Sequence, residues 1–288
     1  MAMKAHRFDS RQNMNNKRFE IFHYRDKQME TVGVHHHDYY EIYFLLGGGV
    51  SFQIEGKQFA LKPGDLLLIS PQELHQAKVD QDDIYERYVL WINRNYLEEL
   101  GGGQSELTAC FDHNHPDHSN LLHPDKVQRA ILQDLLKKIN TEFYNTDQDS
   151  LLYAQGLLTQ FLVEVNRLTR STVKKQKKQE EPDLISRVLA YIGSHYQESL
   201  TLAEIADEFY ISKYYLAHEF SRRVGTSVYR YITFRRLLQA KELIASGMTP
   251  GTVYQHCGFG DYANFYRAFK AEYGISPREF AEQSSRSD

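Results

Sequence analysis

Histidine and glutamate side chains in the first third of the chain have the types and spacing of a binding site. In an extended strand, His35, His37, Tyr39, Glu41 and Tyr43 share one face, because successive side chains alternate. Imidazole nitrogens and a carboxylate are suitable ligands for a divalent metal ion. The same groups could instead line a pocket for a small organic molecule, or form a structural cluster of satisfied polar groups.

A further histidine, His75, follows a second predicted strand and could converge on the same space inside a barrel. The spacing His35-x-His37-x-x-x-Glu41 resembles the first cupin motif. The second cupin motif is incomplete, because Glu73 stands where a glycine is usual and His75 comes one residue early. The metal alternative therefore involves His35, His37, Glu41 and His75, and the pocket alternative involves the same face.

Aromatic residues are abundant, with 20 Tyr, 16 Phe and a single Trp. Such rings supply apolar area together with a polar group, which suits a pocket for a polar ligand. Trp91, Tyr43 and Phe52 are candidate surfaces for stacking a sugar ring, with core packing as the alternative for each. The residues expected to line such a ligand pocket are His35, His37, Tyr39, Glu41, Tyr43, His75 and Trp91.

An internal repeat with an offset of 49 residues occupies the C-terminal part of the chain. Its members are Ser212, Leu216, Phe220 and Gly225, which recur as Asp261, Phe265, Phe269 and Gly274. Each set combines an N-cap, two apolar positions on one helix face and a terminal glycine. A short helix precedes each cap, over 202–209 and 252–257. The pattern predicts two helix-turn-helix units joined by a helix over 228–246.

Several short motifs accompany the repeat: Ala203–Ala206, Arg236-Leu237-x-x-Ala240-x-x-Leu243, Gly258-Phe259, Phe269-Lys270 and Ser276-Pro277. With them, about 100 residues of the C-terminal part of the chain resemble the AraC/XylS family of transcription regulators. The resemblance implies a DNA-binding domain with two recognition helices. It also implies a cupin-like sensor that holds a small organic effector, commonly a sugar, and a role in activating carbohydrate genes.

The predicted recognition helices run from 212 to 224 and from 261 to 273. Their expected DNA contacts are Lys213, Tyr214, Ala217, His218, Arg222 and Arg223 in the first helix, and Tyr262, Ala263, Asn264, Tyr266, Arg267 and Lys270 in the second. By resemblance, Tyr214, Ala217 and His218 match base-facing positions. Arg267 could read guanine and Asn264 adenine, whereas terminal cations suit phosphate. A solvated helix surface is the alternative for any single residue.

Composition narrows the class of protein. The chain has 34 Lys and Arg against 38 Asp and Glu, a net charge of −4, so only locally placed cations can favour DNA. Two distant cysteines exclude a disulfide framework or a multi-cysteine zinc site. No apolar run reaches the ~18 residues of a membrane span, and the N-terminus lacks the apolar core of a signal peptide. We expect a soluble cytoplasmic protein.

The elements that position these residues follow from periodicity. Between residues 20 and 93, alternating segments and glycine-rich turns predict short strands of a barrel or sandwich. Residues 94–123 read as irregular. Two helices follow, with expected core positions Val127, Ile131, Leu135 and Ile139, and Leu151, Ala154, Leu158, Phe161, Val165 and Leu168. The two helices could simply cover the sheet, but further apolar residues favour pairing with a second copy: Leu132, Leu136, Leu152, Leu157 and Leu162.

We therefore predict an α+β fold with an N-terminal cupin-like β-barrel or sandwich and a C-terminal all-α domain. The expected domains are 1–173 for effector binding and dimerisation, a charged linker at 174–183, and 184–288 for DNA binding. The expected protein is a homodimeric regulator without cofactor or enzymatic activity. Its partners would be double-stranded DNA, a carbohydrate-like effector and, for an activator, RNA polymerase. The alternatives are a metal-dependent cupin enzyme with accessory DNA binding, or an effector-independent regulator.

Overall fold

The computed structural model describes residues 14–27, 32–80, 83–102, 107–112, 118–173 and 183–284. The chain divides into two compact units: the first holds the residues up to 180 except the turn 55–57, and the second holds those from 181 onward. Residues 174–182 of the predicted linker lie outside the described residues. Its last residue, Asp183, is the N-cap of a helix. Within the described ranges, we find no helix that is long and apolar enough to cross a membrane.

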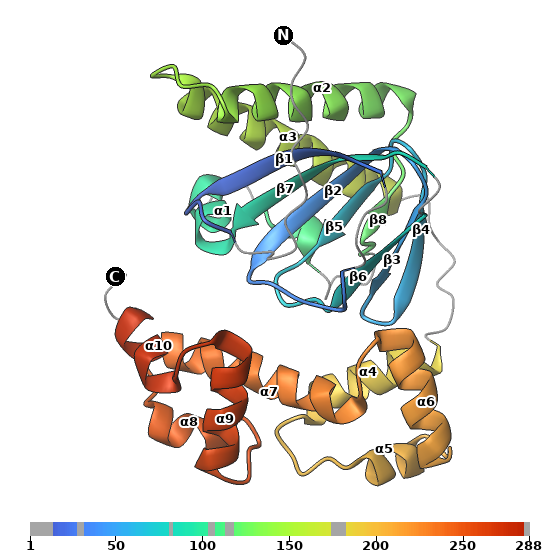
Figure 1. The fold of residues 1–288 in the computed structure, drawn as a ribbon, viewed down its shortest axis with the longest axis vertical. Coiled ribbons are helices and arrows are strands. Elements are labelled where there is room, and N and C mark those ends of the chain that lie inside the picture. The colour runs from blue at the N-terminus through green and yellow to red at the C-terminus, as the bar shows by residue number, and fades with distance from the viewer. Residues whose placement is uncertain are drawn as a thin grey trace. The chain divides into compact units, whose positions relative to one another are not determined.

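The first unit is built on two antiparallel sheets (Figure 1). Its strands are β1 (Phe19–Asp26), β2 (Tyr39–Gly47), β3 (Val50–Ile54), β4 (Lys57–Leu61), β5 (Leu66–Ile69), β6 (His75–Val79), β7 (Tyr85–Asn93) and β8 (Leu121–Leu122). The larger sheet has the order β1-β7-β2-β5-β8 and the smaller one β4-β3-β6. This arrangement confirms the predicted β domain, and the second unit confirms the predicted helical one.

Period-two alternation gives the larger sheet two buried faces. Tyr43 and Leu45 of β2 belong to a cluster with Phe52 of β3, so they fill the space between the sheets. Their neighbours Ile42 and Phe44 belong to a separate cluster on the opposite face. One strand therefore serves two cores, because its successive side chains point to opposite sides of the sheet.

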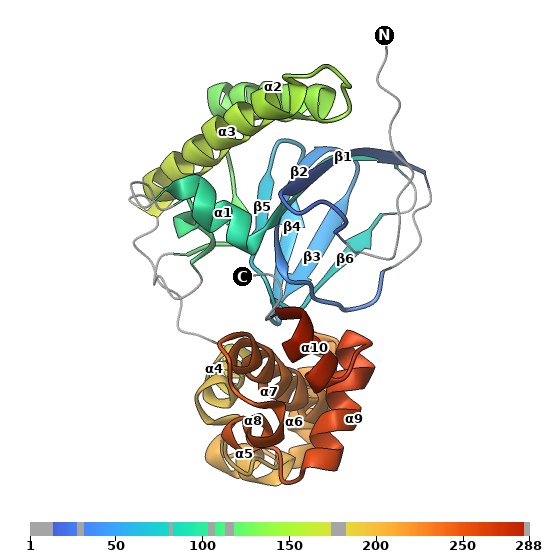
Figure 2. The ribbon, with the colours of Figure 1, turned by 90° about the vertical axis from the view of Figure 1, so that its left-hand side faces the viewer.

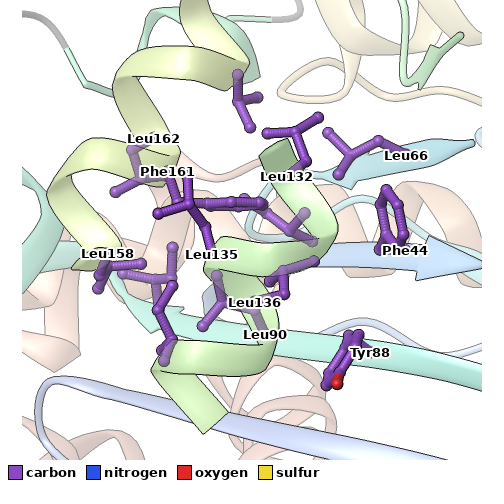
Figure 3. Packing of buried hydrophobic residues seen from close by; sticks show 14 of the residues in the cluster. Phe44, Leu66, Tyr88, Leu90, Leu132, Leu135, Leu136, Leu158, Phe161 and Leu162 are labelled. Atoms are coloured by element: carbon purple, nitrogen blue, oxygen red, sulfur yellow. The ribbon is translucent and has the colours of Figure 1, made fainter. Parts of the chain in front are cut away.

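Two long helices, α2 (Lys126–Phe143) and α3 (Ser150–Val173), cover the outer face of the larger sheet (Figure 2). Asp125 begins α2 with a capping box that includes Gln128. Figure 3 shows leucines of both helices, with Phe161 among them, packed over Phe44, Leu66, Tyr88 and Leu90 of the sheet. The helices thus complete a three-layer unit.

The face on which α2 and α3 pack differs from the predicted one. Val127 and Ile131, expected in the core, are 69% and 42% exposed. Leu132 and Leu136, expected to meet a second copy, are buried in the chain's own core. Likewise, Leu157 and Leu162 are buried, and of the five supposed contact leucines only Leu152 is exposed. The sheet selects the face that fits it, which the spacing within one helix does not reveal.

The segment expected to be irregular, 94–123, begins with a helix, α1 (Arg94–Gly101). Asn93 caps it by accepting a hydrogen bond from the backbone N–H of Tyr96, and Gly102 ends it in the left-handed conformation. A 3₁₀ turn, η1 (Ala109–Phe111), follows. Only Leu97 of α1 is buried, so its sequence carries little helical periodicity.

The second unit consists of α4 (Leu184–His195), α5 (Leu202–Glu208), α6 (Lys213–Val224), α7 (Val228–Ala245), α8 (Pro250–His256), α9 (Tyr262–Tyr273) and α10 (Pro277–Ser284). Leu237, Ala240 and Ile244 of α7 pack with Phe265 and Phe269 of α9. At the other end of α7, the ring of Tyr231 lies edge-on to that of Phe220 in α6. Figure 1 shows α6 and α9 near opposite ends of α7, which joins them.

Candidate DNA-reading helices and effector cavity

The first helix-turn-helix unit is formed by α5 and α6. Thr201 begins α5 with a capping box that includes Glu204, and Ser212 begins α6 by accepting from the N–H of Tyr215. Leu216 and Phe220 are fully buried, which confirms the predicted inward face of α6. The opposite face of α6 is consequently available to a partner.

The exposed side of α6 carries the side chains that we predicted to contact DNA. Tyr214 is 77% exposed, and the Lys213 ammonium lies 5.4 Å from the centre of its ring. His218 is exposed and Ala217 half-buried. The structure thus brings the base-facing candidates to one surface, with cationic and aromatic character.

The two arginines at the C-terminal end of α6 are engaged within the unit. Arg222 binds Glu219 through two hydrogen bonds of 2.9 and 2.5 Å. Arg223 donates to the carboxylate of Asp183 at 2.7 Å. Both pairs are partly exposed, and such pairs contribute little to stability. A phosphate can therefore compete for either guanidinium at a small cost.

The second helix-turn-helix unit, formed by α8 and α9, repeats this construction. Pro250 occupies the first turn of α8, and Asp261 caps α9 by accepting from the N–H of Asn264. Phe265 and Phe269 are fully buried, as predicted for the inward face. The equivalence of the two units therefore extends from the sequence to the helices and their caps.

Polar side chains on the exposed face of α9 form a chain of hydrogen bonds. The Asn264 amide donates to Asp261, and Arg267 donates to Asn264 Oδ1 at 2.5 Å. The other predicted contacts on this helix are Tyr262, Ala263, Tyr266 and Lys270, and all but the half-buried Tyr266 are exposed. The two candidate base readers, Asn264 and Arg267, thus lie beside each other on one surface.

Sequence reasoning missed the exposed tyrosines of the first unit that lie outside its predicted contact set. Tyr210, in the turn between α5 and α6, is 96% exposed, and Tyr215 of α6 is also exposed, as is Tyr229 at the start of α7. The high tyrosine content of the chain could have pointed to them, but we took it as a sign of a ligand pocket. Arg236, by contrast, is structural, because it donates to the carbonyls of Tyr196 and Glu198, both at 2.7 Å.

A cavity lies between the two sheets of the N-terminal unit, with a volume of about 40 Å³. Space of this size accommodates a few water molecules, at about 10–15 Å³ each by the same measure. Its lining residues are Tyr24, Val32, His35, Glu41, Tyr43, Phe52, His75, Ala77, Tyr85, Arg87, Val89 and Trp91. Five of the seven predicted effector contacts are among them.

Glu41 connects both sheets at this cavity. Its Oε1 accepts from the indole N–H of Trp91 at 3.0 Å, since Glu41 and Trp91 are paired across β2 and β7. Its Oε2 lies 3.1 Å from His37 Nε2 and 3.4 Å from His75 Nε2. A two-residue antiparallel bridge places His35 beside His75, with backbone hydrogen bonds in both directions.

Two predicted effector contacts, His37 and Tyr39, lie behind the cavity and do not line it. Their rings stack at 3.9 Å between centres, and Tyr39 also contacts Trp91 at 4.8 Å. They therefore support the cavity wall. Of the four residues predicted as possible metal ligands, three bring their ligand atoms together: His37, Glu41 and His75. His35 is not part of this group.

Among the cavity residues that sequence reasoning missed, Arg87 is the charged one. It is 1% exposed, donates to Asp26 at 2.6 Å, and its guanidinium lies over the rings of Tyr24 and Tyr85. Period-two spacing with Val89 and Trp91 on β7 was the available signal. The cavity thus contains one buried guanidinium and one buried carboxylate, each already paired within the chain.

Burial controls the ionisation of the cavity groups. It lowers the pKa of His35 to about 4, with His75 adding to the effect, and it also lowers the pKa of His75. Burial opposes the ionisation of Glu41, but its contacts with His37 and His75 hold the pKa of this carboxyl well below its usual range. Burial raises the pKa of Tyr85, so its hydroxyl stays protonated at neutral pH.

Comparison with known proteins assigns both units. Residues 19–162 match the AraC-like ligand binding domain, and residues 205–283 match a helix-turn-helix domain. The HTH-type transcriptional activator RhaS from Escherichia coli O157:H7 (strain EC4115 / EHEC) is 22% identical over 251 residues, covering 86% of this chain and 87% of RhaS.

Similar solved structures include unsaturated fatty acid-bound wild-type ToxT from Vibrio cholerae strain SCE256. It is 15% identical, covers 93% of this chain and 96% of that chain, and has a TM-score of 0.41. Another is the C-terminal domain of AraT, a response regulator from Geobacillus stearothermophilus. It is 25% identical over 36% of this chain and 88% of that chain, with a TM-score of 0.35. From the two domain matches and their order, the chain belongs to the AraC family of transcription regulators, with an AraC-like ligand-binding domain followed by a helix-turn-helix DNA-binding domain.

Proposed function

We propose that the chain regulates transcription in response to a carbohydrate-like effector bound in the cavity of its β-sandwich. The observation that carries this proposal is the pair of buried hydroxyls of Tyr43 and Tyr85, which have no hydrogen-bond partner within the described residues. Leaving a buried polar group unpaired costs about 1–3 kcal/mol. A ligand that carries hydroxyl groups would satisfy both.

A sugar ring also has an apolar face, which suits the aromatic lining. Trp91 and Phe52 offer such surfaces on opposite sheets, and Arg87 and Glu41 supply a donor and an acceptor. The cavity has room for only a few water molecules, so a monosaccharide requires movement of lining side chains. That movement is a physical route by which binding could alter the rest of the domain.

Trp91 makes this proposal directly testable, because it is the only tryptophan and lines the cavity. Titration with mono- and disaccharides should change its fluorescence, and the same sugars should raise the unfolding temperature. A ligand present at 100 times its dissociation constant raises the free energy of unfolding of the domain that binds it by about 2.7 kcal/mol.

The matched variants are Tyr85→Phe, which removes a cavity hydroxyl, and Tyr88→Phe, on the opposite face of the same strand. The first should weaken sugar binding and the second should not. If no saccharide changes either signal, the effector is not a carbohydrate.

On the DNA side, we propose that α6 and α9 enter successive major grooves on one face of the duplex. Lys213, Tyr214, Ala217 and His218 would read the first groove, with Arg222 and Arg223 at phosphates. Tyr262, Ala263, Asn264, Tyr266 and Arg267 would read the second, with Lys270 at a phosphate. Support comes from α7, whose 18 residues extend about 27 Å, compatible with the ~34 Å spacing of grooves on one face.

The relative RhaS is described as a transcriptional activator. We propose the same role here, with RNA polymerase as the protein partner. A reporter gene placed behind a binding site for this protein tests the direction. Expression should rise when the protein is supplied, and a fall would identify a repressor.

We also propose that the protein is a homodimer through the N-terminal half of α3. Leu151, Leu152 and Tyr153 are 40%, 70% and 58% exposed, and Leu152 and Tyr153 line a surface groove with Gly156 and Gln160. Sedimentation of the full chain should show a dimer at tens of micromolar. Leu152→Asp should shift it to monomer, whereas Val127→Asp, 69% exposed on α2, should leave the dimer intact. A monomeric wild type contradicts the proposal.

A further inference from the structure

The three histidines at the cavity are held in the same way. In each ring, Nδ1 contacts a backbone carbonyl oxygen: His35 with Gly33 at 2.9 Å, His37 with Tyr39 at 2.9 Å, and His75 with Glu73 at 2.8 Å. A carbonyl oxygen only accepts hydrogen bonds, so Nδ1 must carry the proton in each ring. In the neutral imidazole, Nε2 is then a bare lone pair directed away from the carbonyl.

Two of these lone pairs face a carboxylate oxygen. His37 Nε2 and His75 Nε2 lie 3.1 and 3.4 Å from Glu41 Oε2, and the His75 contact leaves its ring nitrogen without a satisfying hydrogen bond. The other oxygen of Glu41 is occupied by the indole N–H of Trp91. In the metal-free protein, a proton on the Nε2 of His37 or His75 would turn its contact with Glu41 into a hydrogen bond, and a metal ion could take the place of that proton.

The two separations between Glu41 and the imidazole nitrogens match those between the ligands of a small metal ion. Nitrogen and oxygen ligands at about 2.0–2.1 Å in a tetrahedron are about 3.3 Å from one another. The observed 3.1 and 3.4 Å bracket that value. All three ligand atoms lie within 4.8 Å of one another, so any closer approach that the two imidazole nitrogens need is small. Hydrogen bonding of the opposite ring nitrogen to a carbonyl is also the usual support for a metal-binding histidine.

We propose that His37, Glu41 and His75 bind one divalent transition metal ion of the zinc type. Two neutral imidazoles and one carboxylate are a common three-residue set for such an ion, with a further position left for water or ligand. Glu41 and His75 line the cavity, so that position would face the space assigned to the effector. The metal site stands on the three side chains alone and does not require a carbohydrate effector.

Co²⁺ is a suitable probe, because in sites with few ligands it absorbs visible light with an intensity that reports coordination number. Metal-free full-length protein, titrated with Co²⁺, should develop this absorption with a stoichiometry of one. The emission of Trp91 should be quenched in parallel, because its indole donates to the same carboxylate. Zn²⁺ should then displace the Co²⁺.

Glu41→Gln is the decisive variant. Its amide oxygen can still accept from Trp91, and its NH₂ group can donate to an imidazole Nε2, so the metal-free protein should remain folded with equal or higher thermal stability. Co²⁺ affinity should fall by at least about 100-fold, since even outer partners of a metal site are worth 10–100-fold. The matched control is Glu86→Gln, which alters a His–Glu pair with His23 elsewhere in the same sheet and should leave Co²⁺ binding unchanged.

Equal Co²⁺ affinity in the wild type and Glu41→Gln would overturn the proposal. So would the absence of a visible Co²⁺ spectrum in the wild type. His37→Gln provides an independent second variant if Glu41→Gln does not fold, and it should lose the same spectrum. Because the titration contains no sugar, a failed sugar screen leaves these results intact, and the reverse also holds.

Discussion

The two helix-turn-helix units end their first helices with the same backbone geometry but with different residues. In the first unit, Tyr210 has φ of +55°, and in the second, Gly258 has φ of +82°. The flanking hydrogen bonds correspond, because Ile211 and Phe259 each donate to the carbonyl five residues earlier. The two units therefore share the same turn, but the residue at its left-handed position differs.

The reason for the difference is local packing. A Cβ at Gly258 would lie 2.6 Å from the carbonyl oxygen of Gln197, so only glycine fits there. Tyr210 is 96% exposed, so its side chain meets no such obstacle, and only the backbone strain of a non-glycine residue remains. The second turn is fixed by a neighbour, whereas the first is free to present a large aromatic group.

The exposed surfaces differ in the same sense. The first helix-turn-helix unit presents Tyr210, Tyr214 and Tyr215. The second presents one less exposed tyrosine, Tyr262, beside the polar series Asp261, Asn264 and Arg267. One unit is thus suited to aromatic and hydroxyl contacts and the other to bidentate hydrogen bonding with base edges. We expect the second unit to contribute more to sequence preference.

The largest changes in stability should come from the buried phenylalanines that the two helix-turn-helix units share. Phe220→Ala and Phe269→Ala each remove a fully buried ring and should each lower the free energy of unfolding by about 3–5 kcal/mol. Circular dichroism follows the helices of both units, most of which belong to the C-terminal one, and Trp91 fluorescence follows the sandwich alone. Both variants should shift the first signal and spare the second. Tyr229→Ala, exposed on α7, is the control, and a small change in either Phe variant would show that the two cores are not equivalent.

DNA affinity should separate the units. Arg267→Ala should cost about 1–3 kcal/mol and relax the preference at one base pair, because only arginine offers a planar fork to guanine. Lys270→Ala and Arg222→Ala should weaken all sequences alike and flatten the salt dependence. Binding to sites altered one base pair at a time, at fixed salt, measures both. An equal loss on every sequence for Arg267→Ala would place its contact on phosphate.

The smallest effects concern the turn and should have opposite signs. Gly258→Ala should destabilise the helical unit by more than about 1 kcal/mol, because the new Cβ meets Gln197 and the backbone is left-handed. Tyr210→Gly should be neutral or stabilising by up to about 1 kcal/mol, because relief of strain is partly offset by the flexibility of glycine. Thermal unfolding by circular dichroism compares them, and destabilisation by Tyr210→Gly would mean that its side chain packs.

Local signals explain what the sequence could predict. Ser212 and Asp261 are caps, and Leu216, Phe220, Phe265 and Phe269 recur at helical spacing, so both recognition helices follow from their own segments. Glu41 and His75 were grouped from strand parity and a turn. These predictions needed no knowledge of which element packs on which.

The remainder depends on contacts between distant segments. Which face of α2 is buried is decided by the sheet, so Leu132 replaces Val127 in the core. Arg87 can be buried because β1 pairs with β7, the strands that carry Asp26 and Arg87. The separation of His37 and Tyr39 from the cavity likewise depends on how the two sheets close. Periodicity within one segment contains none of this information.

The central claim is that both units read one duplex, with α6 and α9 in neighbouring major grooves. The most direct measurement is the footprint of the full-length protein on a site enriched from random DNA. Each protomer should protect about 20 base pairs, with two contact zones about 10 base pairs apart on one face. Arg267→Ala should remove contacts from one zone only. If each protomer protects a single zone, and a substitution in either α6 or α9 leaves that zone unchanged, the account is contradicted.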